Sequence, residues 1–149
     1  MIRCVLIVNE EGEPRLVRFY DQTRIGAEQH MVVKLAYDLL KNRNSDCCFL
    51  KTSKIDGTLI YRHYASLYFI VIADECESEL GILDLLQVFV HILNNCFENI
   101  CELDIVYHYD RVNYVLDEMV MAGMVLETNT EVLLSTLADL NAVRYLCLP

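Results

Sequence analysis

Cysteine and histidine have the most reactive side chains in this chain, which contains seven cysteines and four histidines. No two histidines stand at the HExxH or HxxxH spacing that places two imidazoles on one side of a helix. No CxxC pair occurs, and the nearest approach is Cys96 and Cys101, with four residues between them. A zinc site needs several well-spaced ligands, so the sequence predicts none. A catalytic Cys–His pair stays open, because such partners meet in space; it would require a low-pKa thiol in a cleft.

Glycine and carboxylate patterns add no catalytic motif. The five glycines form neither GxGxxG nor a phosphate-binding P-loop, and no GxSxG nucleophile elbow is present. The adjacent acids Asp117 and Glu118, and the group Glu75, Glu77 and Glu79, are typical of solvated helix faces or of partners for a helix dipole. These results favour a binding or structural role and predict neither a cofactor nor a metal.

Three arginines, Arg3, Arg15 and Arg18, lie on or near the first predicted hairpin of an acidic chain. Lysine and arginine number 12 against 22 aspartates and glutamates, a net charge of −10 that argues against broad binding to a nucleic-acid backbone. We expect Arg3 and Arg15 to be neighbours on adjacent strands. The arginines are either surface residues paired with nearby glutamates or a small positive site for an acidic group of a partner. The glutamates in question are Glu10, Glu11 and Glu13.

The apolar content is high for an acidic chain, since 54% of residues are hydrophobic and the mean hydropathy is +0.28. This excess indicates either a large core or a surface that a partner covers. A chain of 149 residues is expected to form one domain, residues 1–149. The longest stretches without Asp, Glu, Lys or Arg are 63–73 and 85–97, shorter than the ~18 residues of a membrane span. No signal peptide is predicted, so we expect a cytosolic protein with reduced cysteines in its core.

Hydrophobic periodicity predicts strands in the first half of the chain, interrupted by one helix. Residues 2–8 and 16–20 form a predicted hairpin around the polar turn 9–12. Residues 27–41 place apolar side chains at three- and four-residue steps, which predicts an amphipathic helix. Three more strands follow, and the last is expected to be central because it is apolar on both faces. These strands are 47–51, 58–64 and 67–73.

The most apolar helix is predicted at residues 80–97, with Ser78 as its N-cap. Apolar residues cover most of its circumference, which predicts burial on more than one side, one of them against a different protein. Residues 101–109 fit either a strand or a helix.

The C-terminal part of the chain is predicted to be helical. A stripe over 112–120 indicates one helix, with Gly123 as its expected C′ residue. Thr128 and Glu131 have the spacing of a capping box and open a last helix. The element order predicts one mostly antiparallel sheet with helices packed on it.

Several segments, taken together and in order, resemble the small (sigma) subunits of the heterotetrameric vesicle-coat adaptor complexes. They are MIR at 1–3, PRLVRFY at 14–20, IYRHYASLYF at 60–69, CELD at 101–104 and DEM at 117–119. Two further segments resemble most the sigma subunit of adaptor protein complex 3. They are ESELGILDLLQVFV at 77–90 and GMVLETN at 123–129. The resemblance covers essentially the whole chain and is strongest over 59–129.

The resemblance implies an α+β fold of the longin-like (SNARE-like) type, with a five-stranded antiparallel sheet and helices on both faces. In this family the segment after Cys101 is helical, so we predict a helix there. A large adaptin chain holds each sigma subunit tightly, which accounts for the apolar helix at 80–97.

The resemblance also implies a function: the family recognises acidic dileucine signals, of the form (D/E)xxxL(L/I), in cytosolic tails of membrane cargo. Arg15 matches the arginine that faces the acidic end of the signal. Tyr64, Ala65 and Leu67 match a strand that lines the leucine pockets, and the remaining walls match residues on and after the long helix. These wall residues are Val90, Asn99, Ile100 and Ile105.

The partners implied are delta-type and beta-type large adaptin chains, a mu medium chain, an Arf-family GTPase acting on the complex, and dileucine tails. The chain would stabilise the complex, without catalysis or a cofactor, on the cytosolic face of endosome, Golgi and transport vesicles. Cargo would travel to lysosome- or vacuole-type organelles. The alternatives are a longin-type subunit of a vesicle tethering complex and a small Cys/His enzyme.

Overall fold

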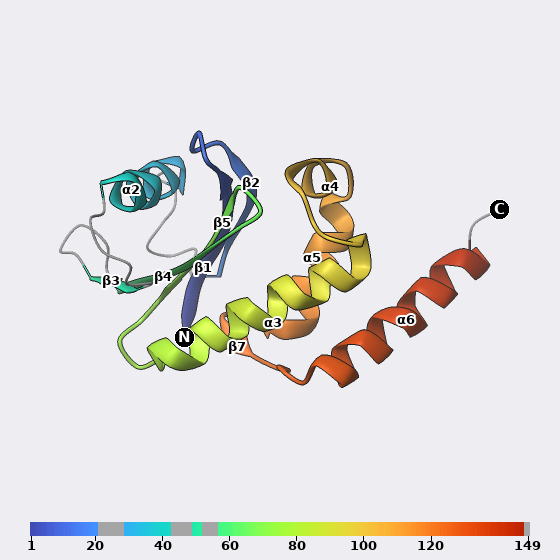
Figure 1. Cartoon of the computed structure of the whole chain (residues 1–149). Coiled ribbons are helices and arrows are strands. Elements are labelled where there is room, and N and C mark those ends of the chain that lie inside the picture. Colours follow the sequence, from blue (N-terminus) through green and yellow to red (C-terminus); the bar gives the residue numbers. More distant parts are fainter. Residues whose placement is uncertain (21–28, 43–48, 52–56, 148–149) are drawn as a thin grey trace.

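The computed structural model describes residues 1–20, 29–42, 49–51 and 57–147, with side chains up to residue 139 (Figure 1). A five-stranded antiparallel sheet has the order β2-β1-β5-β4-β3. The strands are β1 (Ile2–Asn9), β2 (Pro14–Phe19), β3 (Phe49–Lys51), β4 (Thr58–Tyr64) and β5 (Leu67–Ala73). The predicted order of elements up to α3, two strands, a helix and three strands, is confirmed, and β5 is central as expected.

Alternation along β1 and β5 divides the core into two clusters, one on each face of the sheet. Val5 and Ile7 join the cluster under α3 (Glu79–Phe97), whereas Cys4 and Leu6 face α2 (Gln29–Lys41). Successive side chains of a strand point to opposite faces, so a strand that is apolar at every position must be covered on both sides. Figure 1 shows α2 on one face of the sheet and α3 on the other.

Five further helical or strand elements follow α3. Helix α5 (Tyr109–Met119) packs beside α3, and the short α4 (Glu102–Tyr107) packs beside β2. The hairpin β6 (Val120–Met121) and β7 (Met124–Val125) leads into α6 (Thr130–Cys147). Helix α6 contacts α3 and α5, and its C-terminal half reaches away from the other elements (Figure 1).

Helix α3 begins and ends at residues with clear local signals. The Ser78 hydroxyl accepts a hydrogen bond from the Gly81 N–H, which confirms the predicted N-cap. Residue Glu98 ends the helix in the left-handed conformation, with φ of 51°. By length and hydropathy α3 is the one helix in the described part of the chain that could span a membrane. Its core-facing side chains pack on the sheet.

The far side of α3 corrects the expectation that it is apolar around most of its circumference. A polar stripe of exposed side chains follows the helix at three- and four-residue steps. This stripe consists of Asp84, Gln87, His91 and Asn95. Within this chain α3 is therefore buried along one broad face, and the exposed Leu80 at its start is an exception.

The end of α5 corrects the prediction that Gly123 caps a helix. The helix ends at Met119, and Ala122 and Gly123, with φ of 51° and 82°, form the tight turn of the β6–β7 hairpin. A Cβ at Gly123 would lie 2.4 Å from the Ile2 carbonyl oxygen, so glycine is needed here for space as well as for φ. A helix C′ position and a hairpin turn both need positive φ, so the local sequence fits both.

The segments before α5 and α6 also differ from what their local sequence patterns predict. Residues 101–109 form α4 and the start of α5, as the family resemblance predicts and not as a strand. At α6, Asn129 replaces Thr128 as the capping residue, because its side-chain oxygen accepts hydrogen bonds from the N–H groups of Glu131 and Val132. Residues 27 and 28 of the predicted helix 27–41 lie outside the described part of the chain, as do residues 47 and 48 of the predicted strand 47–51.

The cysteines do not all lie in the core as predicted. Cys4 is buried and Cys96 is half-buried, but Cys76 and Cys101 are exposed. Burial raises the pKa of the Cys4 thiol to about 12. Thiolate is the reactive form, so Cys4 combines a low thiolate fraction with no access for a reagent.

Alkylation of the native protein with iodoacetamide is expected to modify Cys76 and Cys101 and to spare Cys4 until the chain unfolds. Peptide mass spectrometry at several times gives the rate for each cysteine, with the same reaction in denaturant as the control. Equal native rates for Cys4 and Cys76 would contradict the packing of β1 against α2.

Candidate functional site

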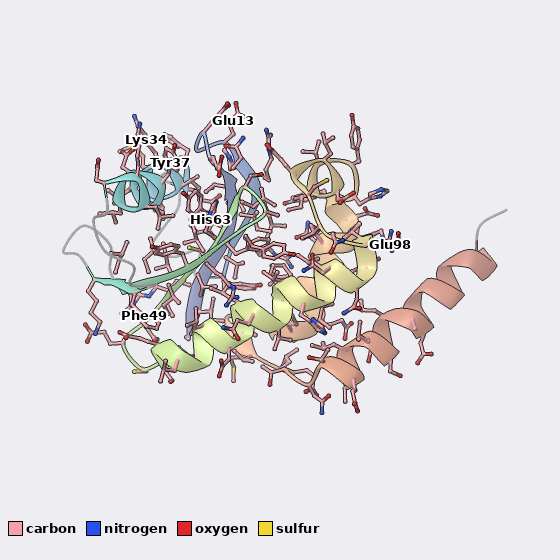
Figure 2. The ribbon with its side chains drawn as sticks, viewed as in Figure 1. Glu13, Lys34, Tyr37, Phe49, His63 and Glu98 are labelled. Carbon is pink, nitrogen blue, oxygen red and sulfur yellow. The ribbon has the colours of Figure 1, made fainter. Side chains whose placement is uncertain are left out.

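The eight residues predicted for the sorting-signal site come from five places in the fold. Arg15 is near the start of β2, and Tyr64, Ala65 and Leu67 surround the β4–β5 turn. Val90 is on α3, the pair Asn99 and Ile100 follows α3, and Ile105 is on α4. Figure 2 shows Glu98 at the end of α3, where the chain turns toward α4.

Asn94 on α3 connects three of these segments through its side chain. Its amide nitrogen donates to the Tyr64 hydroxyl at 3.0 Å, and its side-chain oxygen accepts from the Ile100 N–H at 2.9 Å. Its backbone oxygen accepts from the Asn99 N–H. One amide therefore fixes the end of β4 against the segment between α3 and α4. Nothing in the local sequence distinguishes Asn94 from its neighbour Asn95, so sequence reasoning missed it.

The aliphatic members of the site belong to one buried cluster. Leu67 and Ile105 are 0% exposed, Ile100 is 2% and Val90 is 5%. Tyr64 packs against the same cluster and is half-buried. These side chains therefore all lie in the core on the α3 side of the sheet, and the packing of this chain covers them. A leucine side chain from outside can contact them only after one of the elements that carry them moves.

The β4–β5 turn presents backbone at the edge of this cluster. Ala65 and Ser66 have φ of 49° and 64°, and both are exposed. Two consecutive left-handed residues form the type of two-residue turn that suits the twist of a hairpin, although glycine or asparagine is the usual choice. Ala65 is thus a small residue in a strained turn, and Tyr64 and Leu67 pair on either side of it.

Arg15 is bound by two carboxylates of the same chain. Its Nε donates to Glu102 Oε1 at 2.7 Å, and an Nη donates to Glu13 at 2.6 Å. The same Glu102 oxygen accepts from Asn9 Nδ2 at 2.9 Å. The Asn9 side-chain oxygen accepts from the Glu11 and Glu13 N–H groups, which holds the hairpin turn in place.

The charges of this network reinforce one another. The hydrogen bonds from Asn9 and Arg15 hold the pKa of the Glu102 carboxyl below its ordinary value. The bond to Glu102 likewise raises the pKa of Arg15. Since the pKa of Glu102 is lowered on folding, its contribution to stability is present above its unfolded pKa and is lost as the pH falls through its folded pKa. The ion pair is therefore fully formed at neutral pH.

The other two arginines are not part of this site. Arg18 on β2 donates to Asn113 and Asp117 of α5. Arg3 lies at the opposite end of the β1–β2 ladder from Arg15, since the Arg3 carbonyl accepts from Tyr20 N–H. The expectation that Arg3 and Arg15 are neighbours is therefore wrong: the register of the hairpin separates them. The expected pairing of Arg15 with Glu13 is confirmed.

Glu102 is an additional residue at the site. Glu102 was within a recognisable motif, CELD, but its pairing with a residue 87 positions away has no local signature. Leu103 is the neighbour of Glu102 on α4, and its large apolar side chain is exposed.

A separate cavity of about 750 Å³ lies between the β1–β2 turn and α2. Its walls include Gly12, Val17, Val33, Lys34 and Tyr37. None of the eight predicted residues lines it. Among the residues that the structure describes, no three His, Cys, Asp or Glu side chains gather to hold a metal ion.

The sequence matches a family of known proteins over residues 1–144. A family model described as clathrin adaptor complex small chain matches residues 1–144. The chain belongs to this family. It is 51% identical to human AP-3 complex subunit sigma-2 over 133 residues, which is 87% of this chain and 69% of the relative. It is 47% identical to the AP-3 complex subunit sigma of Dictyostelium discoideum over 141 residues, 91% of this chain and 82% of the relative.

The adaptor small chain also has a structural counterpart. A chain of a homology model of the full-length AP-3 complex in a stretched open conformation aligns with a TM-score of 0.76 and 38% identity. The alignment covers 96% of this chain and 95% of the other. The predicted α+β, longin-like fold and the likeness to AP-3 sigma subunits are both confirmed. This small chain is thus a sigma-type subunit of an adaptor complex that acts in vesicle transport.

Proposed function

We propose that this sigma-type chain, as a single longin-like domain, stabilises the core of an AP-3-type adaptor complex and contributes its site for acidic dileucine signals. The observation that supports the signal site is the position of Arg15 beside α4, whose Ile105 belongs to the aliphatic cluster with Leu67, Val90 and Ile100. One cation next to a cluster of aliphatic residues matches a signal made of one acid and two leucines.

The chemistry of such a signal fits these residues. The acidic side chain of the peptide accepts a charge-assisted hydrogen bond from the arginine, because the planar guanidinium matches the geometry of a carboxylate. Each leucine gains about 1.5–3 kcal/mol when its side chain is fully removed from water. The acid therefore adds orientation, and the two leucines supply most of the binding free energy.

We place the assembled complex on the cytosolic face of endosome, Golgi and transport-vesicle membranes, with lysosome- or vacuole-type organelles as the destination of cargo. Its other members would be delta-type and beta-type large chains and a mu chain, and an Arf-family GTPase would bring the complex to the membrane. The small chain would reach the membrane only through the complex, without binding nucleic acid and without catalysing a reaction.

Two experiments test this proposal. Gentle affinity purification of the tagged chain is expected to recover two large adaptin-like chains and one medium chain in equal amounts. The purified complex should then bind a fluorescent acidic dileucine peptide, and replacement of both leucines by alanine should abolish the binding. Recovery of tethering factors instead, or equal affinity for the two peptides, would remove the proposed function.

Exposed apolar side chains support the proposed contact with a large chain. Met121, Met124 and Leu126 on and after the β6–β7 hairpin are 63%, 65% and 54% exposed. Met1 lies against the turn of this hairpin, because a Cβ at Gly123 would approach Met1 Cγ to 2.8 Å. An exposed apolar patch of this kind marks a protein-binding surface.

Acidic residues flank the same patch. Glu77 binds the α-amino group of Met1 at 2.7 Å, and Glu127 follows Leu126 in the chain. We therefore propose that a segment of the large adaptin chain with apolar residues between basic ones covers the hairpin.

Replacement of Met121 and Met124 together by glutamate is expected to lower the recovery of the large chain by at least about tenfold, because burial of unpaired carboxylates is costly. Co-expression of all four subunits and quantification of the purified complex measures this. The matched control is Met31→Glu, since Met31 on α2 is 58% exposed and lies on the other side of the sheet. Normal assembly of the double variant would show that this hairpin is not covered.

A further inference from the structure

The bonds of Glu102 suggest a role in the site that goes beyond structural support. Its Oε1 accepts from Arg15 Nε at 2.7 Å and from Asn9 Nδ2 at 2.9 Å. Arg15 is the residue proposed to meet the acid of a signal. Before any peptide binds, then, a carboxylate of this chain already occupies the guanidinium.

Glu102 also connects α4 to the first hairpin. It is the first residue of this six-residue helix, and Ile105, one turn later, is fully buried in the aliphatic cluster. The bonds to Arg15 and Asn9 thus connect the helix that carries Ile105 to the β1–β2 hairpin. Both bonds converge on one oxygen, so loss of the Glu102 charge weakens both.

Entry of leucine side chains requires part of the core to move, because the four aliphatic residues predicted for the site are between 0% and 5% exposed. Leu67 is on β5, which pairs with a strand on each side. Val90 is on α3, a helix of 19 residues. Ile100 and Ile105 are on the connection after α3 and on the short α4. A short helix attached through a partly exposed ion pair is the element that opens at the lowest cost.

We propose that Glu102 is an internal competitor for Arg15 and a latch on α4: the acid of a dileucine signal displaces Glu102 from Arg15, and release of α4 opens the leucine site. The inference rests on the proposed signal-binding function. It makes Glu102 a determinant of specificity, because a peptide with two leucines but no acid must open the cluster without help. Recognition of the acid and of the leucines is then coupled.

Binding measurements on the purified four-subunit complex test the latch. Two peptides are compared, an acidic dileucine peptide and the same peptide with glutamine in place of the acid. With Glu102→Gln, affinity for the peptide that lacks the acid is expected to rise about tenfold, the change that corresponds to one charge-assisted hydrogen bond. The advantage of the acidic peptide over the other is expected to shrink.

Two control variants separate the latch from simpler explanations. Glu13→Gln removes the other carboxylate that binds Arg15. Glu13, labelled in Figure 2, is in the turn between β1 and β2 and not on α4. It should leave affinity for the peptide without the acid unchanged. Asp117→Asn removes a partner of Arg18 that joins β2 to α5, and it should change neither affinity.

A second measurement needs no peptide. Amide hydrogen exchange over α4 is expected to be faster in the Glu102→Gln complex than in the Asp117→Asn complex. The latch would be overturned if the Glu102→Gln complex showed normal exchange over α4 and an unchanged affinity for the peptide without the acid. Binding of the acidic peptide by the wild-type complex would still support the proposed function in that case. Failure of every complex to bind either peptide would remove the proposed function and the latch with it.

Discussion

Reversal of the charge at Arg15, by Arg15→Glu, is expected to weaken binding of an acidic dileucine peptide by at least about tenfold, with assembly of the complex unchanged. The variant removes the cation that a signal acid would bind, and it places a third carboxylate beside Glu13 and Glu102. Like charges at this distance repel the incoming acid as well as one another. Fluorescence anisotropy with the whole complex measures the affinity, and subunit stoichiometry measures the assembly.

Two further substitutions make this result specific to Arg15. Arg18→Glu changes the same charge three residues away on β2, where the arginine binds Asn113 and Asp117. It should leave peptide affinity unchanged. Arg15→Lys keeps the charge but loses the planar donor pair, so it should give an intermediate affinity. Wild-type affinity in Arg15→Glu would exclude Arg15 from cargo binding, and loss of assembly would make it a structural residue.

Replacement of Phe69 by alanine is expected to lower the free energy of unfolding by about 3–5 kcal/mol, the usual cost of removing a buried aromatic ring. Phe69 is fully buried on the central strand, and its ring meets Phe89 of α3 edge to face with centroids 6.1 Å apart. The cavity would form between the sheet and α3. Little local relaxation is available there, because β5 is paired on both sides.

Urea denaturation of the purified protein measures this change, and Tyr107→Ala provides the control. Tyr107 is a large aromatic residue at the exposed end of α4, so its removal should change stability by no more than about 0.5 kcal/mol. A loss below about 1 kcal/mol for Phe69→Ala would contradict close packing of the sheet against α3.

The two arginines on β2 show how far sequence reasoning reached at the candidate site. Arg15 was singled out from the hairpin arginines because it matches the arginine that faces the acidic end of the signal in the sigma-subunit family. Glu13 was one of three nearby glutamates named as partners for the hairpin arginines, because all three are close to Arg15 in the chain. Glu102 was not foreseen as its partner, and neither was the separation of Arg3 from Arg15, because both depend on how distant segments pair.

The sequence alone determined the five strands of the main sheet and most of the helices, because their signals are local. Val5 and Ile7 alternate with Cys4 and Leu6, and this period of two places apolar groups on both faces of a strand whatever surrounds it. The cap at Ser78 is equally local, since its hydroxyl reaches an N–H only three residues away. The motif series indicated the family for the same reason, as it is written along the chain.

The tertiary structure alone decided which residues meet at the site and whether it is open. The sequence around Gly123 suits a helix end and a hairpin turn equally, because both need a positive φ. Packing against Ile2 places Gly123 in the hairpin. The aliphatic cluster is closed because four segments converge on it, and Glu102 reaches Arg15 across 87 positions of chain. Side-chain burial and long-range charge pairing are properties of the whole packed chain, and no local pattern encodes them.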